Sequence, residues 1–306
     1  MKVCVTGGAG FIGSNLVDRL LTDGYEVVVI DNLSSGKMEN LRTHPKLTFL
    51  KRNILENVEN AIEGCSVVFH LAAIPQVQFS IKHPIETNRI NVNGMLNILD
   101  TCLKKNVKRF VFSSSAAIYG DQDRMPVIET MKSNPMSPYA LQKLVGETYC
   151  RLYQKLYGLE TVCLRYFNVY GPKQNPNSEY SSLIPKFIRN AKSNKILTIF
   201  GDGNQTRDFV FVSDVVNANL FASTTQNKDA FDGVFNIGSG ENHSVNQVVD
   251  VINKLSGGRV KISHVSPVIE PRNSLAGIDK SERILKWRPE ISFENGLSQT
   301  YELFSL

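Results

Sequence analysis

A tyrosine and a lysine four positions apart, Tyr139 and Lys143, are the residues whose types and spacing most directly suggest chemistry. On a helix, residues at i and i+4 share one face and lie a few ångströms from each other. A fixed ammonium beside a phenol favours the phenolate, so Tyr139 is predicted to act as a base below its ordinary pKa of about 10. Ordinary helix faces also show this spacing, so the prediction depends on what else the chain carries.

A glycine-rich turn follows the first apolar run. Lys2–Thr6 has the pattern of a strand, and it leads directly into the glycines at 7, 8, 10 and 13, where a helix is expected to begin. Glycines let the backbone approach a pyrophosphate, and a helix N-terminus offers free N–H groups and positive potential. This order predicts a dinucleotide site; the alternative is a tight turn without a ligand.

Asp31 closes the second expected strand, 18 residues after Gly13. A carboxylate there can accept hydrogen bonds from both hydroxyls of a ribose, and it repels a 2′-phosphate. Asn32 follows it instead of an arginine, so NAD rather than NADP is the predicted cofactor. Taken alone, Asp31 could equally be a turn or cap residue.

The apolar pattern places these residues in an alternating β/α fold. Short β-branched runs that are apolar on both faces are typical of buried parallel strands. They occur at Lys2–Thr6, Glu26–Asp31, Thr48–Arg52, Ser66–His70, Arg109–Ser113 and Thr161–Arg165. Helical patterns separate them at Phe11–Asp23, Glu86–Lys105 and Pro138–Tyr157. The alternation predicts an α/β fold with a Rossmann-like, doubly wound parallel sheet.

The pattern changes after Arg165, and Gly, Pro and Asn crowd residues 168–178. Helices are then expected near Ser181–Ser193, Asp214–Ser223, Val245–Leu255, Lys280–Leu285 and Phe293–Leu303, and strands near Leu197–Phe200, Arg207–Val212 and Val234–Ile237. We therefore predict a Rossmann domain at 1–167, to which the chain returns at about 207–238. A smaller mixed α/β substrate-binding lobe would comprise 168–206 and 239–306.

The composition is typical of a soluble globular protein. The 306 residues are 42% hydrophobic and 21% charged, and the net charge of +5 is spread along the chain. This spread predicts no nucleic-acid surface, and no apolar run approaches the roughly 18 residues of a membrane span. The five cysteines form no C-x-x-C pair, so we expect buried free thiols in a reducing cytosol, without disulfides or a metal site. With a strand expected from Lys2, we expect no signal peptide and a cytoplasmic location.

Together these motifs resemble those of the extended short-chain dehydrogenases/reductases. More narrowly, they resemble the NAD-dependent sugar epimerase/dehydratase family, with the UDP-glucose/UDP-galactose 4-epimerases as the nearest members. The resemblance runs from residue 1 to about 290, and its most specific segments are 6–13, 31–36, 70–73, 91–94, 113–120, 139–143, 165–172 and 201–209.

The resemblance implies a catalytic group of Ser115, Tyr139 and Lys143. Ser115 would hydrogen-bond the reacting sugar oxygen beside Tyr139, and Lys143 would also hold the nicotinamide ribose. Without the tyrosine and the lysine, the serines at 113–115 would be interpreted as a polar strand end.

The resemblance also implies cofactor contacts along the carboxyl edge of the sheet. They are Gly7, Gly10, Phe11, Ile12, Gly13, Asp31, Asn32, Ser35, Gly36, Asn53, Ile54, Leu71, Ala72, Ala73, Asn91, Ser113, Tyr139, Lys143 and Tyr166. Small side chains at Ala72 and Ala73 would admit the dinucleotide. Asn91 would sit near the nicotinamide, although an asparagine inside a helix could equally face solvent.

On the substrate side, the resemblance implies contacts to a UDP-sugar. They are Ser115, Tyr139, Asn168, Leu183, Thr198, Phe200, Arg207, Phe209, Arg272 and Ser274. The two arginines suit a diphosphate because a guanidinium donates two hydrogen bonds at once. Leu183, Thr198, Phe200 and Phe209 would face uracil and ribose, or could equally be plain core residues.

Three features depart from the family pattern. Asn53 stands where an adenine-binding aspartate is usual, and Pro75 stands where some members carry a lysine to the cofactor phosphates. The stretch 270–276 is several residues shorter than the usual loop, which affects the assignment of Arg272 and the shape of the pocket.

The resemblance implies that the reaction starts by oxidising C4 of the sugar, with Tyr139 taking the hydroxyl proton and NAD the hydride. Dehydratases of the family carry an acid pair directly after the catalytic hydroxyl residue, where this chain has Ala116 and Ala117, which cannot exchange protons. Epimerisation at C4 needs no further residue, because the keto sugar turns over and takes the hydride back on its other face. We therefore predict a UDP-glucose/UDP-galactose 4-epimerase activity, with room for N-acetyl sugars beside the small Ser274.

Two other functions stay open. Epimerisation or decarboxylation of UDP-glucuronate would be favoured by a pocket arginine facing the C6 carboxylate, which the sequence cannot place. A non-catalytic NAD sensor would need the glycines but not the catalytic group.

A homodimer is expected through the two long predicted helices, 86–105 and 138–157. Their apolar stripes, which could equally face the sheet, are Ile90, Leu96, Leu99, Leu103, Leu141, Val145 and Leu152.

Overall fold

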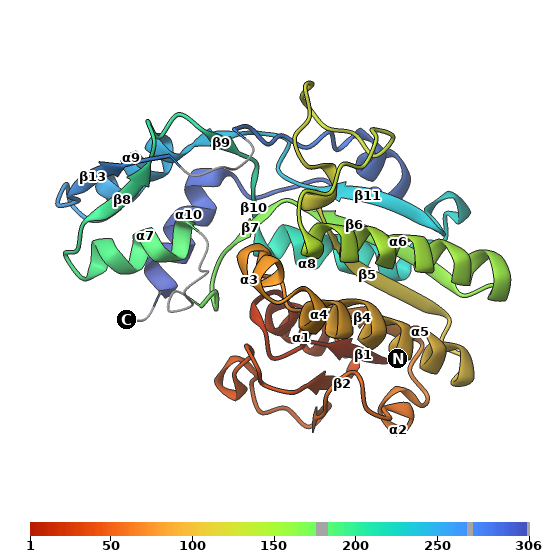
Figure 1. Ribbon diagram of the computed structural model, residues 1–306. Coiled ribbons are helices and arrows are strands. Elements are labelled where there is room, and N and C mark those ends of the chain that lie inside the picture. Colours follow the sequence, from red (N-terminus) through yellow and green to blue (C-terminus); the bar gives the residue numbers. More distant parts are fainter. Residues whose placement is uncertain (176–182, 268–271, 305–306) are drawn as a thin grey trace.

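A seven-stranded parallel sheet forms the centre of the computed structural model, which describes residues 1–175, 183–267 and 272–304 (Figure 1). The order of its strands is β11-β6-β5-β4-β1-β2-β3. They are β1 (Lys2–Thr6), β2 (Glu26–Asp31), β3 (Leu47–Lys51), β4 (Val67–His70), β5 (Arg109–Ser115), β6 (Glu160–Tyr166) and β11 (Gly233–Ile237). The predicted Rossmann-like α/β fold is therefore confirmed.

Helices cover both faces of this sheet (Figure 1). Successive residues of a strand point to opposite faces, so Val3 and Val5 of β1 join one core and Cys4 joins the other. The core with Val3 packs against α1 (Phe11–Thr22) and α8 (Val212–Thr224), and the core with Cys4 packs against α2 (Glu59–Ile62), α5 (Met95–Lys104) and α6 (Pro138–Tyr157). All five cysteines lie in this second core as buried free thiols, as expected.

The chain reverses its direction across the sheet at β1, which lies between β4 and β2. The turn after β1 and the segment after β4 therefore meet at the carboxyl edge, where open α/β sheets bind ligands. Gly7, with φ of +71°, permits this contact, since a Cβ on it would lie only 2.7 Å from the backbone N of Ala72.

A second group of elements lies to one side of the sheet (Figure 1). It has a hydrophobic core of its own, built from α7 (Leu183–Lys192), α9 (Val245–Leu255), α10 (Phe293–Leu303) and β8 (Leu197–Phe200), which pairs with β13 (Ile262–Val265). Two small strand pairs complete it, namely β7 (Asn168–Tyr170) with β10 (Phe209–Phe211) and β9 (Thr206–Arg207) with β12 (His243–Ser244). The division into two domains at residues 167, 206 and 238 stays a prediction.

The predicted strand Arg207–Val212 is wrong in its extent. Two short strands, β9 and β10, replace it, and they are separated at Asp208, whose side chain turns inward to bind other loops. Strands β7, β12 and β13 were not predicted, because runs of two to four residues are too short to show an alternating pattern.

The predicted helix Glu86–Lys105 begins earlier and is not regular. It comprises α4 (Pro84–Asn88), a π-helical turn η2 (Arg89–Gly94) and α5, and a separate short helix α3 (Val77–Lys82) precedes it. The start of the helix predicted at Ser181–Ser193 lies outside the described residues. Within the described ranges, no helix combines the length and the apolar character that crossing a membrane requires.

Candidate active site

The structure brings Ser115, Tyr139 and Lys143 together at the carboxyl end of β5. Ser115 is the last residue of that strand, and the tyrosine and lysine lie in the first turns of α6, which begins after the N-cap Ser137. The Ser115 side chain hydrogen-bonds the Tyr139 phenol. The ammonium of Lys143 lies 5.8 Å from the centroid of the Tyr139 ring, so the predicted shared helix face is correct.

The pKa of Tyr139 moves opposite to the expected direction. Burial raises the pKa of the phenol, and the Ser115 hydrogen bond offsets only part of that rise. Lys143 donates to the backbone carbonyl of Ser113 at 2.6 Å, and burial lowers the pKa of its ammonium to about 8. Burial therefore opposes phenolate formation at this position.

Glu147 and Arg165 form a buried ion pair next to the predicted catalytic cluster. Glu147, four residues after Lys143, accepts a hydrogen bond from the Ser114 hydroxyl at 2.6 Å and pairs with Arg165 through contacts of 2.8 and 2.7 Å. The two charged side chains are 3% and 5% exposed. Removing one partner of such a pair typically costs about 3–5 kcal/mol. The sequence analysis missed Glu147, although its i+4 spacing from Lys143 was a usable signal.

The glycine-rich turn leaves the N-terminus of α1 open to a ligand. Gly10 is the N-cap residue, no side chain caps the helix, and its first turn contains no acidic residue. A Cβ on Gly13 would clash with the carbonyl oxygen of Gly7, and one on Gly36 would lie 2.8 Å from the carbonyl carbon of Ala9. Unoccupied helix N–H groups and close backbone packing fit the pyrophosphate of NAD.

Asp31 links this turn to the loop that follows β2. Its Oδ2 accepts from the N–H of Ala9 at 3.0 Å, and its Oδ1 accepts from the N–H of Leu33 at 2.8 Å. Each carboxylate oxygen can accept more than one hydrogen bond, so both retain capacity for ribose hydroxyls. Asp31 is thus a turn residue and a candidate ribose ligand at once.

Asp31→Ala is expected to weaken NAD binding by about 10- to 100-fold, because hydrogen bonds to charged groups contribute about 1.5–3 kcal/mol each. The NAD content of the purified protein and the dissociation constant from calorimetry would measure this. Asp23→Ala is the matched control, since that carboxylate ends α1 in an exposed pair with Arg19. Equal NAD affinity in the two variants would contradict the role of Asp31.

Other predicted cofactor residues surround the turn. Asn53 uses its side-chain oxygen to accept from the N–H of Leu55 at 3.0 Å, and Ile54 is buried in the core on the α6 side. The remaining ones range from exposed to partly buried and follow β1, β2 and β4: Phe11, Ile12, Asn32, Ser35, Leu71, Ala72 and Ala73.

Asn91, Ser113 and Tyr166 direct their polar groups at the protein. Asn91 is 4% exposed and binds the backbone N and O of Ile74 at 2.8 and 3.1 Å and the side chain of Gln142 at 2.8 Å, so it does not face solvent. The Ser113 hydroxyl and the Tyr166 phenol pair at 3.0 Å. The Asn91 side chain therefore holds the segment after β4. The Ser113 and Tyr166 side chains hold each other near the carboxyl end of β5, where Lys143 binds the Ser113 carbonyl.

Four of the polar residues predicted for the substrate, Asn168, Arg207, Arg272 and Ser274, lie in or near β9. A side-chain N–H of Arg207 donates to the carbonyl of Arg272 at 3.1 Å, and the N–H of Ser274 donates to the carbonyl of Thr206 at 3.1 Å. The Asn168 side chain donates to the carbonyl of Asp208 at 3.2 Å. Both predicted arginines thus belong to one small cluster, despite the shortened loop before Arg272.

The residues predicted to face uracil and ribose do not share one environment. Phe209 is 7% exposed and its ring packs with Tyr170 and Phe293, so in its case core packing is observed. Phe200 is 41% exposed, whereas Leu183 and Thr198 are partly buried.

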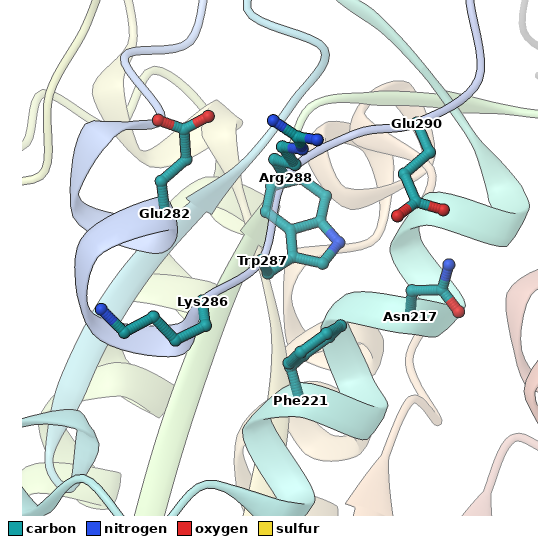
Figure 2. A pocket seen from close by; sticks show the side chains of 7 residues that line it. All are labelled: Asn217, Phe221, Glu282, Lys286, Trp287, Arg288 and Glu290. Atoms are coloured by element: carbon teal, nitrogen blue, oxygen red, sulfur yellow. The ribbon is translucent and has the colours of Figure 1, made fainter.

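A separate hollow of about 380 Å³ lies beside α8, and none of the predicted site residues lines it. Figure 2 shows its charged side chains spread around the buried Trp287. The lining residues are Asn217, Phe221, Glu282, Lys286, Trp287, Arg288 and Glu290. It contains equal numbers of acidic and basic groups and no glycine turn, so we assign the chemistry to the carboxyl edge of the sheet.

Residues 3–238 match the family model described as the NAD dependent epimerase/dehydratase family. A putative UDP-glucose 4-epimerase of Methanocaldococcus jannaschii is 41% identical over 302 residues, which cover 97% of this chain and 96% of that protein.

Two solved structures superpose closely. UDP-glucose 4-epimerase of Thermotoga maritima with UDP-glucose gives a TM-score of 0.94 at 38% identity, covering 99% of this chain and 98% of that chain. UDP-N-acetylglucosamine 4-epimerase of Methanobrevibacter ruminantium M1 in complex with UDP-N-acetylmuramic acid gives 0.94 at 37% identity, covering 99% and 97%.

Proposed function

This chain belongs to the NAD-dependent epimerase/dehydratase family, and on that premise we propose that it interconverts the C4 epimers of a UDP-hexose, first of all UDP-glucose and UDP-galactose. The family match confirms the predicted cofactor, NAD, which when bound supplies a hydride acceptor and a positively charged ring. The observation that carries the proposal is the cluster of Ser115, Tyr139 and Lys143 at the carboxyl edge of the sheet, with only Ala116 and Ala117 after Ser115.

Each member of the cluster has a defined part. Tyr139 takes the proton of the sugar 4-hydroxyl and later returns it, because its phenol is the titratable group that Ser115 holds. Ser115 binds the same sugar oxygen and keeps it beside the phenol. Lys143 fixes the strand end through the Ser113 carbonyl and offers its remaining N–H groups to the nicotinamide ribose.

The proposed diphosphate site consists of Arg207 and Arg272. Arg272 pairs with Asp202 at 3.0 Å, and both side chains are mostly exposed. An exposed pair of this kind contributes only about 0–1 kcal/mol, so a diphosphate can displace Asp202 readily. Ser274, next to this arginine loop, is the small residue that leaves room for a 2-acetamido group.

Action on UDP-glucuronate is the weaker alternative. Arg165, which lies opposite Ser114 in the sheet, forms its ion pair with Glu147 and is 5% exposed. It therefore cannot face a carboxylate at C6 of the sugar. Among the described residues we find no contact that favours this alternative.

The deciding experiment is product identification by NMR after incubating the protein with UDP- and dTDP-hexoses, without added NAD. We expect UDP-glucose and UDP-galactose to reach one equilibrium mixture from either side. Turnover of UDP-glucuronate alone would reject the hexose assignment. Absent turnover of UDP-N-acetylgalactosamine would reject the role of Ser274, and tight NAD binding without any turnover would indicate a sensor.

We also propose a homodimer through the helices of the α6 side. Leu99 is fully buried in the core against the sheet, which is the alternative left open for these stripes, whereas Leu141 and Leu152 of α6 are 52% and 42% exposed. Ile85 of α4, which lies beside α6 in Figure 1, is 86% exposed. Apolar side chains on neighbouring helices suit an interface between two copies.

The combined change Ile85→Glu and Leu141→Glu is expected to halve the sedimentation mass, because it places charges in the proposed interface. Phe221→Glu is the control, since Phe221 is 41% exposed on α8, on the other face of the sheet. A wild-type protein that sediments as a monomer would reject the dimer.

A further inference from the structure

Asp208 is a fully buried carboxylate between two residues of the predicted substrate site, Arg207 and Phe209. Its Oδ1 accepts from the N–H and the hydroxyl of Ser239 at 2.6 and 2.9 Å. Its Oδ2 accepts from the N–H groups of Gly240 and Ala276 at 3.1 and 3.0 Å. One side chain therefore joins β9 to two segments that lie 31–32 and 68 residues further along the chain.

The segment that ends at Ala276 is the one that carries Arg272 and Ser274. It is also held at its other end, because the N–H of Thr206 donates to the carbonyl of Arg272 at 3.0 Å. Between these two attachments, the segment can present Arg272 beside Arg207 in only a narrow range of positions. Around Ala276 the segment also pairs with Val127, whose N–H donates to the carbonyl of Leu275 at 2.9 Å and whose carbonyl accepts from the N–H of Gly277 at 2.8 Å. Asp208 is the side chain that joins this end of the segment to the residue next to Arg207.

Space around Asp208 is equally restricted. A Cβ added to Gly238 would lie 2.6 Å from the Cβ of Ala276 and 2.8 Å from Oδ2 of Asp208. The three segments are packed so closely that a shift in one must displace another.

We propose that Asp208 is the positioning residue that holds the two arginines in register for the diphosphate of a nucleotide sugar. The inference rests on the proposed function for the identity of the ligand. Asp208 itself has no need to touch the ligand, because its four acceptor contacts are all directed at the protein.

Asp208→Asn tests this directly. The amide replaces one acceptor oxygen by an NH2 group, which would face backbone N–H groups that cannot accept its protons. We expect the affinity for UDP, measured by calorimetry, to fall at least about tenfold and KM for the UDP-sugar to rise by a similar factor. The reason is the loss of hydrogen bonds to a charged carboxylate, which are stronger than hydrogen bonds between neutral groups. The value of kcat and the bound NAD should stay near those of the wild type, since neither the catalytic cluster nor the glycine turn is involved.

Asp214→Asn is the matched control. Asp214 is also a buried carboxylate, 1% exposed, and it accepts from the N–H groups of Glu290 and Ile291 at 3.1 and 3.2 Å. Its partners lead into α10 and not into the arginine segment. We expect it to lower the melting temperature as Asp208→Asn does, with unchanged affinity for UDP.

Gly238→Ala serves as a second variant, because it keeps the carboxylate and displaces its contact with Ala276 by volume alone. Unchanged UDP affinity in Asp208→Asn would overturn the inference. If that variant does not fold, unchanged UDP affinity in Gly238→Ala would overturn it. A loss of UDP affinity in Asp214→Asn as large as that in Asp208→Asn would also overturn it. UDP that fails to bind the wild type would overturn it as well. If the variants show the expected UDP affinities but the wild type converts no sugar, the role of Asp208 stands and the proposed reaction is rejected.

Discussion

Tyr139→Phe is expected to lower kcat by about 100- to 10,000-fold, the usual contribution of a positioned acid–base group. The substitution replaces only the phenol hydroxyl by hydrogen, so we expect the ring to keep its buried position. Affinities for NAD and for the UDP-sugar should therefore stay near those of the wild type. Initial rates of UDP-glucose conversion, followed by chromatography under saturating substrate, measure the effect.

Tyr153→Phe provides the control on the same helix. Tyr153 packs edge-on against Tyr157, with ring centroids 5.2 Å apart, and lies 14 residues after Tyr139 in α6. Losing its hydroxyl should leave kcat unchanged. A Tyr139→Phe enzyme that turns over at the rate of Tyr153→Phe would remove Tyr139 from the mechanism.

Local signals explain which parts of the site could be predicted from sequence. The strand Lys2–Thr6, its glycine turn and the helix start are consecutive in the chain, so their order is visible without a structure. Tyr139 and Lys143 are linked by helix periodicity, which is equally local. The order of strand, glycine turn and helix and the shared face of Tyr139 and Lys143 agree with the structure. No distant contact is needed to place these residues relative to one another.

Long-range partners explain what could not be predicted. Asp208 has the sequence environment of a strand residue, and only the approach of Ser239 and Ala276 shows that it joins three segments. An exposed Asn91 was one alternative from the sequence, and it is wrong because Asn91 is 4% exposed and binds Ile74 and Gln142, which lie 17 and 51 residues away. Such contacts depend on how the elements pack, which no periodicity encodes.

The predicted direction of the Tyr139 pKa shift was wrong, also because it depends on contacts that the local sequence does not show. The spacing from Lys143 suggested a lowered pKa, because it describes only the distance between the two groups along one helix. Burial depends on everything that packs around the phenol, and it raises the pKa instead. The ammonium of Lys143 donates to the Ser113 carbonyl and lies 5.8 Å from the centroid of the Tyr139 ring.

Lys143→Met is expected to lower kcat at neutral pH by about 100-fold or more, since it removes a cation beside a group that must lose its proton. Because a nearby cation favours the phenolate, we expect the pKa of Tyr139, which burial already raises, to rise further without the ammonium. The phenolate fraction at pH 7 then falls, and the rate should increase about tenfold per pH unit as the pH approaches the new pKa. NAD content should fall too, because the ribose loses a donor.

The pH profile separates this role from a merely structural one. In the wild type, the ammonium of Lys143 has a pKa of about 8, so raising the pH past that value removes its charge and should lower the rate. Lys143→Met has no such proton to lose, so this alkaline decline should be absent while the acidic limb moves to higher pH. Lys143→Arg keeps a charge at all accessible pH values and should lose the alkaline decline without that shift. A methionine variant with the profile of the wild type, merely scaled down, would show that Lys143 supports the fold around Ser113 and does not govern the phenol.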